Sequence, residues 1–297
     1  MKNKALERLS SWNTNELKEP FVSVCMLSYN HEKFIQQAID SVLMQQVSFP
    51  VEIVLHDDAS TDKTQEILKQ YDQENSGLFK LLLQKENQRS KLGGGMNPRF
   101  NYPRAKGKYI ALLEGDDYWT DPLKLQKQVD LLEEHEEFSF CATSYYQLIN
   151  NQLRKINTDE IVSHEKIFFK NKSSTATLVF RKNIVSNILN EDLKGIKAGD
   201  WFIQSYACVF FGNGYTLPDN TSVYRIHSNG VWSNYTKKQM GKAGIKVLRS
   251  FEKIFNDKKS QFLIKKAINY RKKEFGLDLK SRILRIKVFK KLSKISR

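Results

Sequence analysis

Apolar runs and amphipathic stretches alternate along the first half of the chain. Short runs of β-branched and other apolar residues are typical of buried strands, and they occupy residues 21–27, 51–55, 78–83 and 108–113. Apolar residues at helical spacing follow the first two runs, at 34–43 and 67–71. Strands that alternate with helices predict an α/β fold with a mostly parallel central sheet flanked by helices.

The pattern changes in the second half of the chain. Residues 122–137 predict a helix, with Asp121 as its N-cap and Pro122 in its first turn. Residues 150–172 are polar, and we expect a mobile excursion there. Further apolar segments predict strands at 138–149, 175–181 and 222–227 and a helix at 199–212.

Polar loops follow three of the predicted strands: "SYN" at 28–30, "HDDAST" at 56–61 and "EGDD" at 114–117. Ligands bind at the carboxyl ends of parallel strands, so we expect these loops to converge on one site. The paired carboxylates of "EGDD" suit a divalent cation, which prefers oxygen ligands, whereas those of "HDDAST" suit hydrogen bonds from a nucleobase or a ribose. Helix capping is the alternative, because acids favour helix N-termini. Since Asp121 already offers a cap, the acids of "EGDD" are surplus to capping.

The net charge of +15 is concentrated at the C-terminal end of the chain. Residues 258–297 contain fifteen Lys and Arg against two acidic residues, which leaves the rest of the chain near +2. Apolar residues from Leu279 to Ile295 recur every three or four positions among these basic residues. This pattern predicts a basic amphipathic helix suited to an anionic membrane surface. A helix docked on the protein with a solvated basic face is the alternative. The segment has no recognisable nucleic-acid-reading motif, so we expect no nucleic-acid partner.

The three cysteines and the N-terminal residues help to predict the cellular compartment of the protein. Cys25, Cys141 and Cys208 lie among apolar neighbours without metal-binding spacing, which predicts buried free thiols in a reducing environment. Residues 1–12 lack the apolar core of a signal peptide. No run reaches the roughly 18 apolar residues that a membrane-spanning helix needs. We therefore expect a cytoplasmic protein.

Four segments resemble, in order, the signatures of the inverting glycosyltransferases of family 2, which have the GT-A fold. They are "VSVCMLSYN", "EIVLHDDASTDKT", "AKGKYIALLEGDDYW" and "YRIHSNGVWS". The resemblance implies a GT-A domain over residues 1–235, with a nucleotide-binding part at about 20–125 and an acceptor part at about 126–235. Residues 236–297 would form a basic helical C-terminal extension.

The resemblance also implies a binding site for a nucleotide-diphosphate sugar, for which we expect a UDP-sugar. Ser28 and Tyr29 would border the nucleotide. Asp58, with Asp57 beside it, would lie near the base and the ribose. Asn97 matches a polar position that lines the donor pocket.

A metal site is implied beside the donor. Asp116 would contact the ribose, and Asp117 would bind Mn²⁺ or Mg²⁺ that bridges the donor pyrophosphate. His227 resembles a position that completes the coordination in some relatives, and a hydrogen-bonded histidine at a strand end is the alternative. "EGDD" replaces the more usual Asp-x-Asp run, so the resemblance assigns Glu114 no role.

Inversion in one step requires a base on the acceptor hydroxyl, and a carboxylate suits this task. Asp200, in "AGDWF", matches the family position of this base, while an N-cap for the following helix is the alternative. Trp201 would stack on a sugar or pack in the core. Arg225 would neutralise phosphate or form an ordinary ion pair.

The combined prediction is a metal-dependent inverting hexosyl- or N-acetylhexosaminyltransferase. We expect its acceptor to be a growing bacterial surface glycan, such as capsule or lipopolysaccharide, with a lipid-linked acceptor as one option. We expect the protein at the inner face of the cell membrane. Two alternatives remain: a sugar-phosphate nucleotidyltransferase, and a non-catalytic membrane or nucleic-acid binder driven by the basic tail. Against the first, "SYNHEKF" is not a basic, glycine-rich triphosphate loop.

Overall fold

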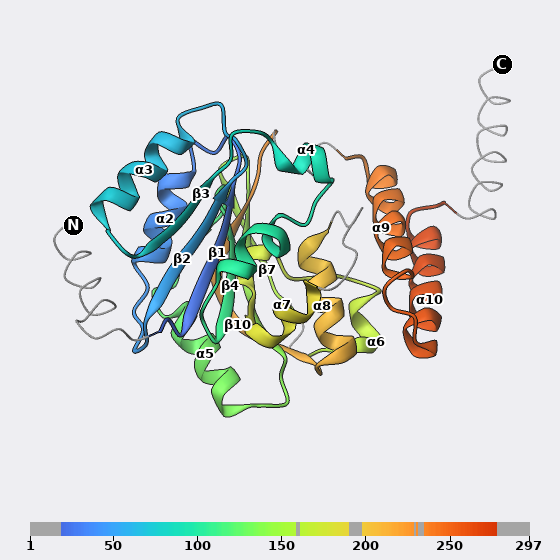
Figure 1. Ribbon diagram of the computed structural model, residues 1–297. Coiled ribbons are helices and arrows are strands. Elements are labelled where there is room, and N and C mark those ends of the chain that lie inside the picture. Colours follow the sequence, from blue (N-terminus) through green and yellow to red (C-terminus); the bar gives the residue numbers. More distant parts are fainter. Residues whose placement is uncertain (1–18, 159–160, 190–197, 229, 231–234, 278–297) are drawn as a thin grey trace, which may run out of the picture. The chain divides into compact units, whose positions relative to one another are not determined.

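The computed structural model describes residues 19–158, 161–189, 198–228, 230 and 235–277 (Figure 1). The chain divides into two compact units. The first comprises residues 1–163 and 172–226, and the second comprises residues 164–171 and 227–297. The predicted division of the first 235 residues into a nucleotide part and an acceptor part stays a prediction.

Four parallel strands form the first half of the sheet in the first unit. Their order is β3-β2-β1-β4, and α2 (Ile35–Leu43) and α3 (Thr64–Glu74) cover one face (Figure 1). The apolar runs found in the sequence reflect this burial, because strands covered on both faces have few solvent-facing positions. The strands are β1 (Val22–Ser28), β2 (Val51–Asp57), β3 (Phe79–Leu83) and β4 (Tyr109–Glu114).

The second half of the sheet is mixed. β9 (Val179–Arg181) runs antiparallel between β4 and β6 (Phe140–Ile149), while β10 (Gly214–Ile226) runs parallel to β6. β5 (Tyr118–Trp119) closes this end, antiparallel to β10. The predicted α/β class is confirmed, and its parallel character belongs to the first four strands.

The expected mobile excursion at 150–172 was wrong. This segment contains β7 (Gln152–Ile156), which pairs with β6, and β8 (Ile161–Val162), which pairs with β10. It also contains α6 (His164–Ile167), in the second unit. β7 is largely exposed, so its polar sequence reflects solvent contact along an added strand rather than a lack of regular structure.

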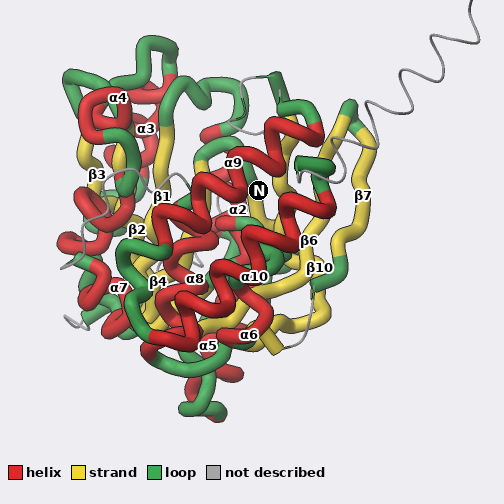
Figure 2. The backbone as a smooth tube through the Cα atoms, turned by 90° about the vertical axis from the view of Figure 1, so that its right-hand side faces the viewer, coloured by secondary structure: helices red, strands yellow, loops and turns green. Residues whose placement is uncertain are grey.

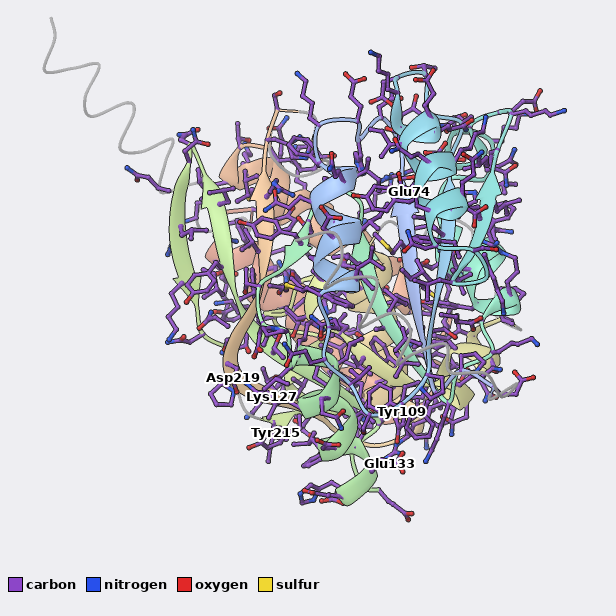
Figure 3. All side chains as sticks on the ribbon, turned by 90° about the vertical axis from the view of Figure 1, so that its left-hand side faces the viewer. Glu74, Tyr109, Lys127, Glu133, Tyr215 and Asp219 are labelled. Carbon is purple, nitrogen blue, oxygen red and sulfur yellow. The ribbon has the colours of Figure 1, made fainter. Side chains whose placement is uncertain are left out.

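α5 (Lys124–Glu134) packs its apolar side into the main core, which also contains residues of β1, β2, β4 and α2. The ammonium of Lys127 lies 2.9 Å from Asp219 of β10, and the hydroxyl of Tyr109 donates to Glu133 (Figure 3). The helix begins two residues later than predicted. Asp121 accepts the backbone N–H of Leu123 at 2.8 Å, ahead of the helix proper.

Short helices complete the first unit. They are α4 (Gln88–Leu92), the π-helix η1 (Asn97–Asn101), the 3₁₀ helices η2 (Tyr102–Arg104) and η3 (Thr175–Thr177), α7 (Lys182–Ile188) and α8 (Gly199–Phe210). The three cysteines are buried and free, as predicted.

The second unit is built on α9 (Lys237–Phe251) and α10 (Lys258–Glu274), which pack against each other (Figure 2). Phe168, from the segment 164–171, packs on the rings of Phe251 and Phe255. None of the helices in the described ranges is long and apolar enough to cross a bilayer. The amphipathic helix predicted between residues 279 and 295 lies outside the described residues.

Candidate functional site

Three loops meet at the carboxyl ends of β1, β2 and β4, as the sequence predicted. The Ser28 hydroxyl donates to Asp57 at 2.8 Å, and the Asp58 N–H donates to the Ser28 carbonyl at 2.9 Å. On the other side of β1, the Gly115 N–H donates to the Leu27 carbonyl at 2.8 Å. The acidic turn after β4 therefore lies beside the loop after β1.

Asp57 binds its own loop. Its carboxylate accepts hydrogen bonds from the Ser28 hydroxyl, from the N–H and hydroxyl of Ser60, and from the Gln65 amide, at 2.5 to 2.9 Å. Asp57 is fully buried. These bonds satisfy the charged oxygens within the protein, which gives Asp57 a structural task. Its predicted donor contact stays a prediction.

Asp58 holds the start of α4. Its two carboxylate oxygens accept the backbone N–H groups of Gln88 and Arg89, at 2.6 and 3.0 Å. These groups have no partner inside the helix, so an acid is favourable there. Asp58 thereby links the end of β2 to α4, which three glycines at 93–95 follow.

Asn97 is nearly buried, whereas Tyr29 is exposed to solvent. Asn97 is 9% exposed, and its carbonyl oxygen accepts from the Asn101 amide at 2.7 Å. The same amide donates to the Met26 carbonyl at 2.9 Å, which ties η1 to β1. Because the side-chain oxygen of Asn97 already accepts this hydrogen bond, its side-chain amide is oriented to offer N–H groups to a ligand. Tyr29 is 44% exposed, which leaves its ring accessible.

The acidic turn holds three carboxylates close together. One oxygen from each of Glu114, Asp116 and Asp117 lies within 4.8 Å of the others. One oxygen of Asp117 accepts the N–H of Arg225 at 2.9 Å, whereas its Oδ2 is buried with no hydrogen-bond partner among the described residues. A buried, unsatisfied carboxylate oxygen is costly, and a cation would satisfy it.

The pKa values of the carboxyl groups in this turn also favour a cation site. Burial raises the pKa of Asp117 well above its usual range, and the charges of Asp116 and Glu114 raise it further. Burial, followed by the charges of Asp116 and Asp200, raises the pKa of Glu114 to about 8. Crowded carboxylates repel each other unless a positive charge joins them, so this donor set fits Mn²⁺ or Mg²⁺.

Asp200 lies in the first turn of α8, where Ala198 rather than Asp200 is the N-cap. Its charge acts on Glu114 and on Tyr145, whose pKa rises to about 12 through burial and then through Asp200. The fold therefore brings Asp200 within electrostatic range of the acidic turn. Trp201 is 5% exposed, which favours packing over sugar stacking.

Arg225 of β10 forms hydrogen bonds to the acidic turn. Its guanidinium donates to the Asp116 carbonyl and to Gln37, and it lies 4.4 Å from the ring centre of Tyr118. These bonds go to neutral groups rather than to the partner of an ordinary ion pair, and the predicted phosphate contact stays a prediction. The partners come from distant segments, so no local sequence signal could have identified them.

His31 and Tyr224 join the site although the sequence assigned them no role. The His31 imidazole lies 3.7 Å from the Asp116 carboxylate. Burial raises the pKa of Tyr224, and Asp117 and Glu114 contribute further. His31 directly follows one signature segment and Tyr224 is the first residue of another, and this proximity was the available signal. His227 belongs to the second unit, so its predicted metal contact stays a prediction.

Residues 23–192 match the sequence profile of a family described as Glycosyl transferase family 2. An uncharacterised protein of Mycobacterium tuberculosis is 33% identical over 224 residues, which cover 73% of this chain and 62% of that protein. The chain thus spans less than two thirds of the length of this relative. A Bacillus subtilis protein provisionally named teichuronic acid biosynthesis glycosyltransferase TuaG is 35% identical over 128 residues, or 42% of this chain and 48% of that protein.

Two solved structures share the fold. The mannosyltransferase PcManGT from Pyrobaculum calidifontis, in complex with GDP-Man and Mn²⁺, gives a TM-score of 0.65 with 16% identity, covering 94% of this chain and 81% of that one. TarS of S. aureus, in complex with UDP-GlcNAc, gives a TM-score of 0.63 with 18% identity, covering 87% and 76%.

Proposed function

Because the chain belongs to glycosyl transferase family 2 and has the GT-A fold, we propose that it transfers a sugar from a nucleotide-diphosphate sugar to an acceptor hydroxyl, with inversion. The observation that carries the proposal is the acidic turn. Three carboxylates, one with a buried and unpartnered oxygen, lie at the carboxyl ends of parallel strands within electrostatic range of Asp200.

The donor nucleotide occupies the strand ends in this proposal. Tyr29 offers an exposed ring, Asn97 offers N–H groups, and Asp116 contacts the ribose. Ser28 and Asp58 shape the loops around the base. We expect a UDP-sugar, in line with TarS in complex with UDP-GlcNAc, whereas PcManGT in complex with GDP-Man supports the broader class of nucleotide-sugar donors.

Asp117 would hold the divalent cation, with Glu114 and Asp116 beside it. When bound, Mn²⁺ or Mg²⁺ stabilises the negative charge that develops on the leaving diphosphate. The Arg225 N–H fixes one oxygen of Asp117, so the other oxygen is presented in a constant direction. The complex of PcManGT with Mn²⁺ is consistent with this assignment.

Asp200 acts as the general base in the transfer step. It accepts the proton of the acceptor hydroxyl while that oxygen forms a bond to the anomeric carbon. The bond between the anomeric carbon and the phosphate oxygen breaks from the opposite face, and its electron pair leaves with the nucleoside diphosphate. The support is the position of Asp200 at the start of α8, within electrostatic range of Glu114.

We further propose that the acceptor is a bacterial surface polysaccharide, with a lipid-linked glycan as one form. The likeness to a protein named for teichuronic acid biosynthesis supports this class of acceptor. We place the reaction at the inner face of the cell membrane, where such carriers are available. The predicted amphipathic helix that favours this location lies outside the described residues.

A turnover assay with Mn²⁺ across a panel of nucleotide sugars tests the proposal. Asp117→Ala should lower turnover by about 10²- to 10³-fold, and EDTA should abolish it in the wild type. Asp200→Asn should lower turnover by about 10²- to 10⁴-fold without lowering the thermal stability. Asp130→Asn, on the exposed face of α5, is the matched control and should keep full activity.

The products separate this function from its rivals. A glycosyltransferase releases a nucleoside diphosphate, whereas a nucleotidyltransferase releases pyrophosphate from a nucleoside triphosphate. Full transfer activity in Asp117→Ala would remove the metal assignment, and full activity in Asp200→Asn would remove the base. Absence of turnover with every donor would leave the binding-only alternative.

A further inference from the structure

The outward side of α10 carries two aromatic side chains that the fold leaves in solvent. Phe262 is 56% exposed and Tyr270 is 51% exposed. They alternate with Lys259, Lys266 and Lys273 at steps of three or four residues, which places the five side chains in one line along the helix. We call these five residues the α10 stripe.

Most of the stripe lies outside the buried side of α10, although the Tyr270 ring also meets Phe169 edge-on, with ring centres 6.0 Å apart. Leu263, Ile264, Ala267 and Ile268 form the buried side of this helix. Two exposed rings among lysines on one line of the helix are available to a partner that offers apolar and anionic groups together. The Lys266 ammonium lies 4.5 Å from the ring centre of Phe262, which keeps a positive charge directly beside the exposed ring.

The surroundings of the stripe are strongly basic. Residues 235–277 contain thirteen Lys and Arg against three acidic residues. Lys259 has an exposed ion pair with Glu165, 2.5 Å apart, and Glu274 lies at the end of the helix. The other two lysines of the stripe, Lys266 and Lys273, lie among further basic residues, so this part of the chain carries a net positive charge. Such a surface favours an extended anionic partner.

We propose that the α10 stripe docks on the surface of a bilayer that contains anionic phospholipids. A helix lying in the interface places aromatic rings among the acyl chains near the headgroups, while lysine stems let the ammonium groups reach the phosphates. The stripe alternates these two kinds of side chain along about 20 Å of helix, at 1.5 Å per residue. The surface lies within described residues and does not depend on the segment 278–297.

A nucleic acid fits this surface less well. Phe262 and Tyr270 are eight residues apart, or about 12 Å along the helix. Proteins that bind single strands stack successive bases on aromatic platforms set in a basic groove. Rings this far apart on an outward helix side provide no such platform, whereas a flat bilayer surface contacts both rings at once.

Flotation of the full chain with vesicles tests the proposal. The wild type should float with phosphatidylcholine vesicles that contain phosphatidylglycerol and should stay unbound with phosphatidylcholine alone. Phe262→Ala/Tyr270→Ala should weaken partitioning by about tenfold, because two buried ring contacts are lost. Lys266→Glu/Lys273→Glu should weaken it by at least about tenfold, because the headgroup attraction is reversed.

Controls keep the result separate from folding and from the transferase proposal. Leu153→Ala removes an equally exposed apolar side chain from β7 and should leave flotation unchanged. All variants should keep the thermal stability of the wild type and full turnover with a soluble acceptor. Turnover can fail while flotation succeeds, so the two proposals fail independently.

Two outcomes would overturn the docking proposal. One is flotation that is absent, or that is equal in the wild type and both stripe variants. The other is binding of a single-stranded oligonucleotide that depends on Phe262 and Tyr270 while vesicles are not bound, which would assign the stripe to nucleic acid.

Discussion

At the scale of single residues, His31 and Asp116 bring two loops of the candidate site together. The two side chains are 3.7 Å apart, and both are 17% exposed. The backbone N–H of His31 donates to the Thr64 hydroxyl at 2.9 Å, which ties its loop to the start of α3. His31 is thus held in place independently of Asp116, and we infer that it positions this carboxylate.

His31→Ala should lower the affinity for a nucleoside diphosphate with Mn²⁺ by roughly five- to tenfold, the size expected for losing one polar contact. Isothermal titration measures this affinity. His31→Gln should restore part of it, which a purely structural role would not predict. His135→Ala removes an exposed histidine at the end of α5 and serves as the control. Equal affinities in His31→Ala and the wild type would contradict the positioning role.

At the scale of elements, the turn between β4 and β5 packs closely against β1 and α2. A Cβ atom on Gly115 would lie 2.8 Å from the His31 ring, 2.9 Å from the Ile35 side chain and 3.2 Å from the Leu27 carbonyl. Contacts this short force a shift of the backbone or of its neighbours. The glycine therefore allows the acidic turn to approach the loop after β1.

Gly115→Ala should displace the acidic turn and lower the affinity for Mn²⁺ by about tenfold, with a loss of about 1–3 kcal/mol in stability. Titration with Mn²⁺ and denaturant unfolding measure the two effects. His31→Ala in the same chain should restore part of the stability, because one of the three contacts is removed. A Cβ on Gly199 meets nothing within 4 Å, so Gly199→Ala should be tolerated. Unchanged Mn²⁺ binding in Gly115→Ala would argue against this packing constraint.

At the scale of the whole molecule, Lys124 places an ionisable group in the core. Its side chain is fully buried, its Nζ lies 4.5 Å from the ring centre of Trp119, and it donates to Gln128 at 2.5 Å. Burial lowers the pKa of Lys124 from 10.5 to about 7. The unfolded chain therefore binds a proton on Lys124 that the folded chain lacks between those two values, so stability rises with pH across this window.

The stability of the wild type should increase relative to Lys124→Met by about 2 kcal/mol between about pH 7 and about pH 9. Denaturant unfolding of both proteins at several pH values measures this difference. The buried cysteines, which also titrate differently on unfolding, are common to both proteins and cancel. Lys69→Met, on the exposed side of α3, should show no such trend. A difference that stays constant with pH would contradict a neutral Lys124 in the core.

The predictions made from the sequence were confirmed where they rested on local patterns, such as polar loops that directly follow apolar strands. The ends of β1, β2 and β4 were expected to converge, and Ser28, Asp57 and Gly115 show that they do. The roles of Asp57 and Arg225 could not be read from the sequence, because their partners lie in other loops and strands. β7 was missed because an exposed strand has the polarity of a loop.

Hydrophobic periodicity and short motifs are local properties, so they were enough to identify the fold class, the strands that end at the candidate site, the family and the acidic turn. Which carboxylate oxygens are already satisfied became known from the folded chain alone. Four hydrogen bonds occupy Asp57, while one oxygen of Asp117 stays buried without a partner among the described residues. The difference depends on atoms brought within hydrogen-bonding distance from remote segments, and a linear sequence does not encode those distances explicitly.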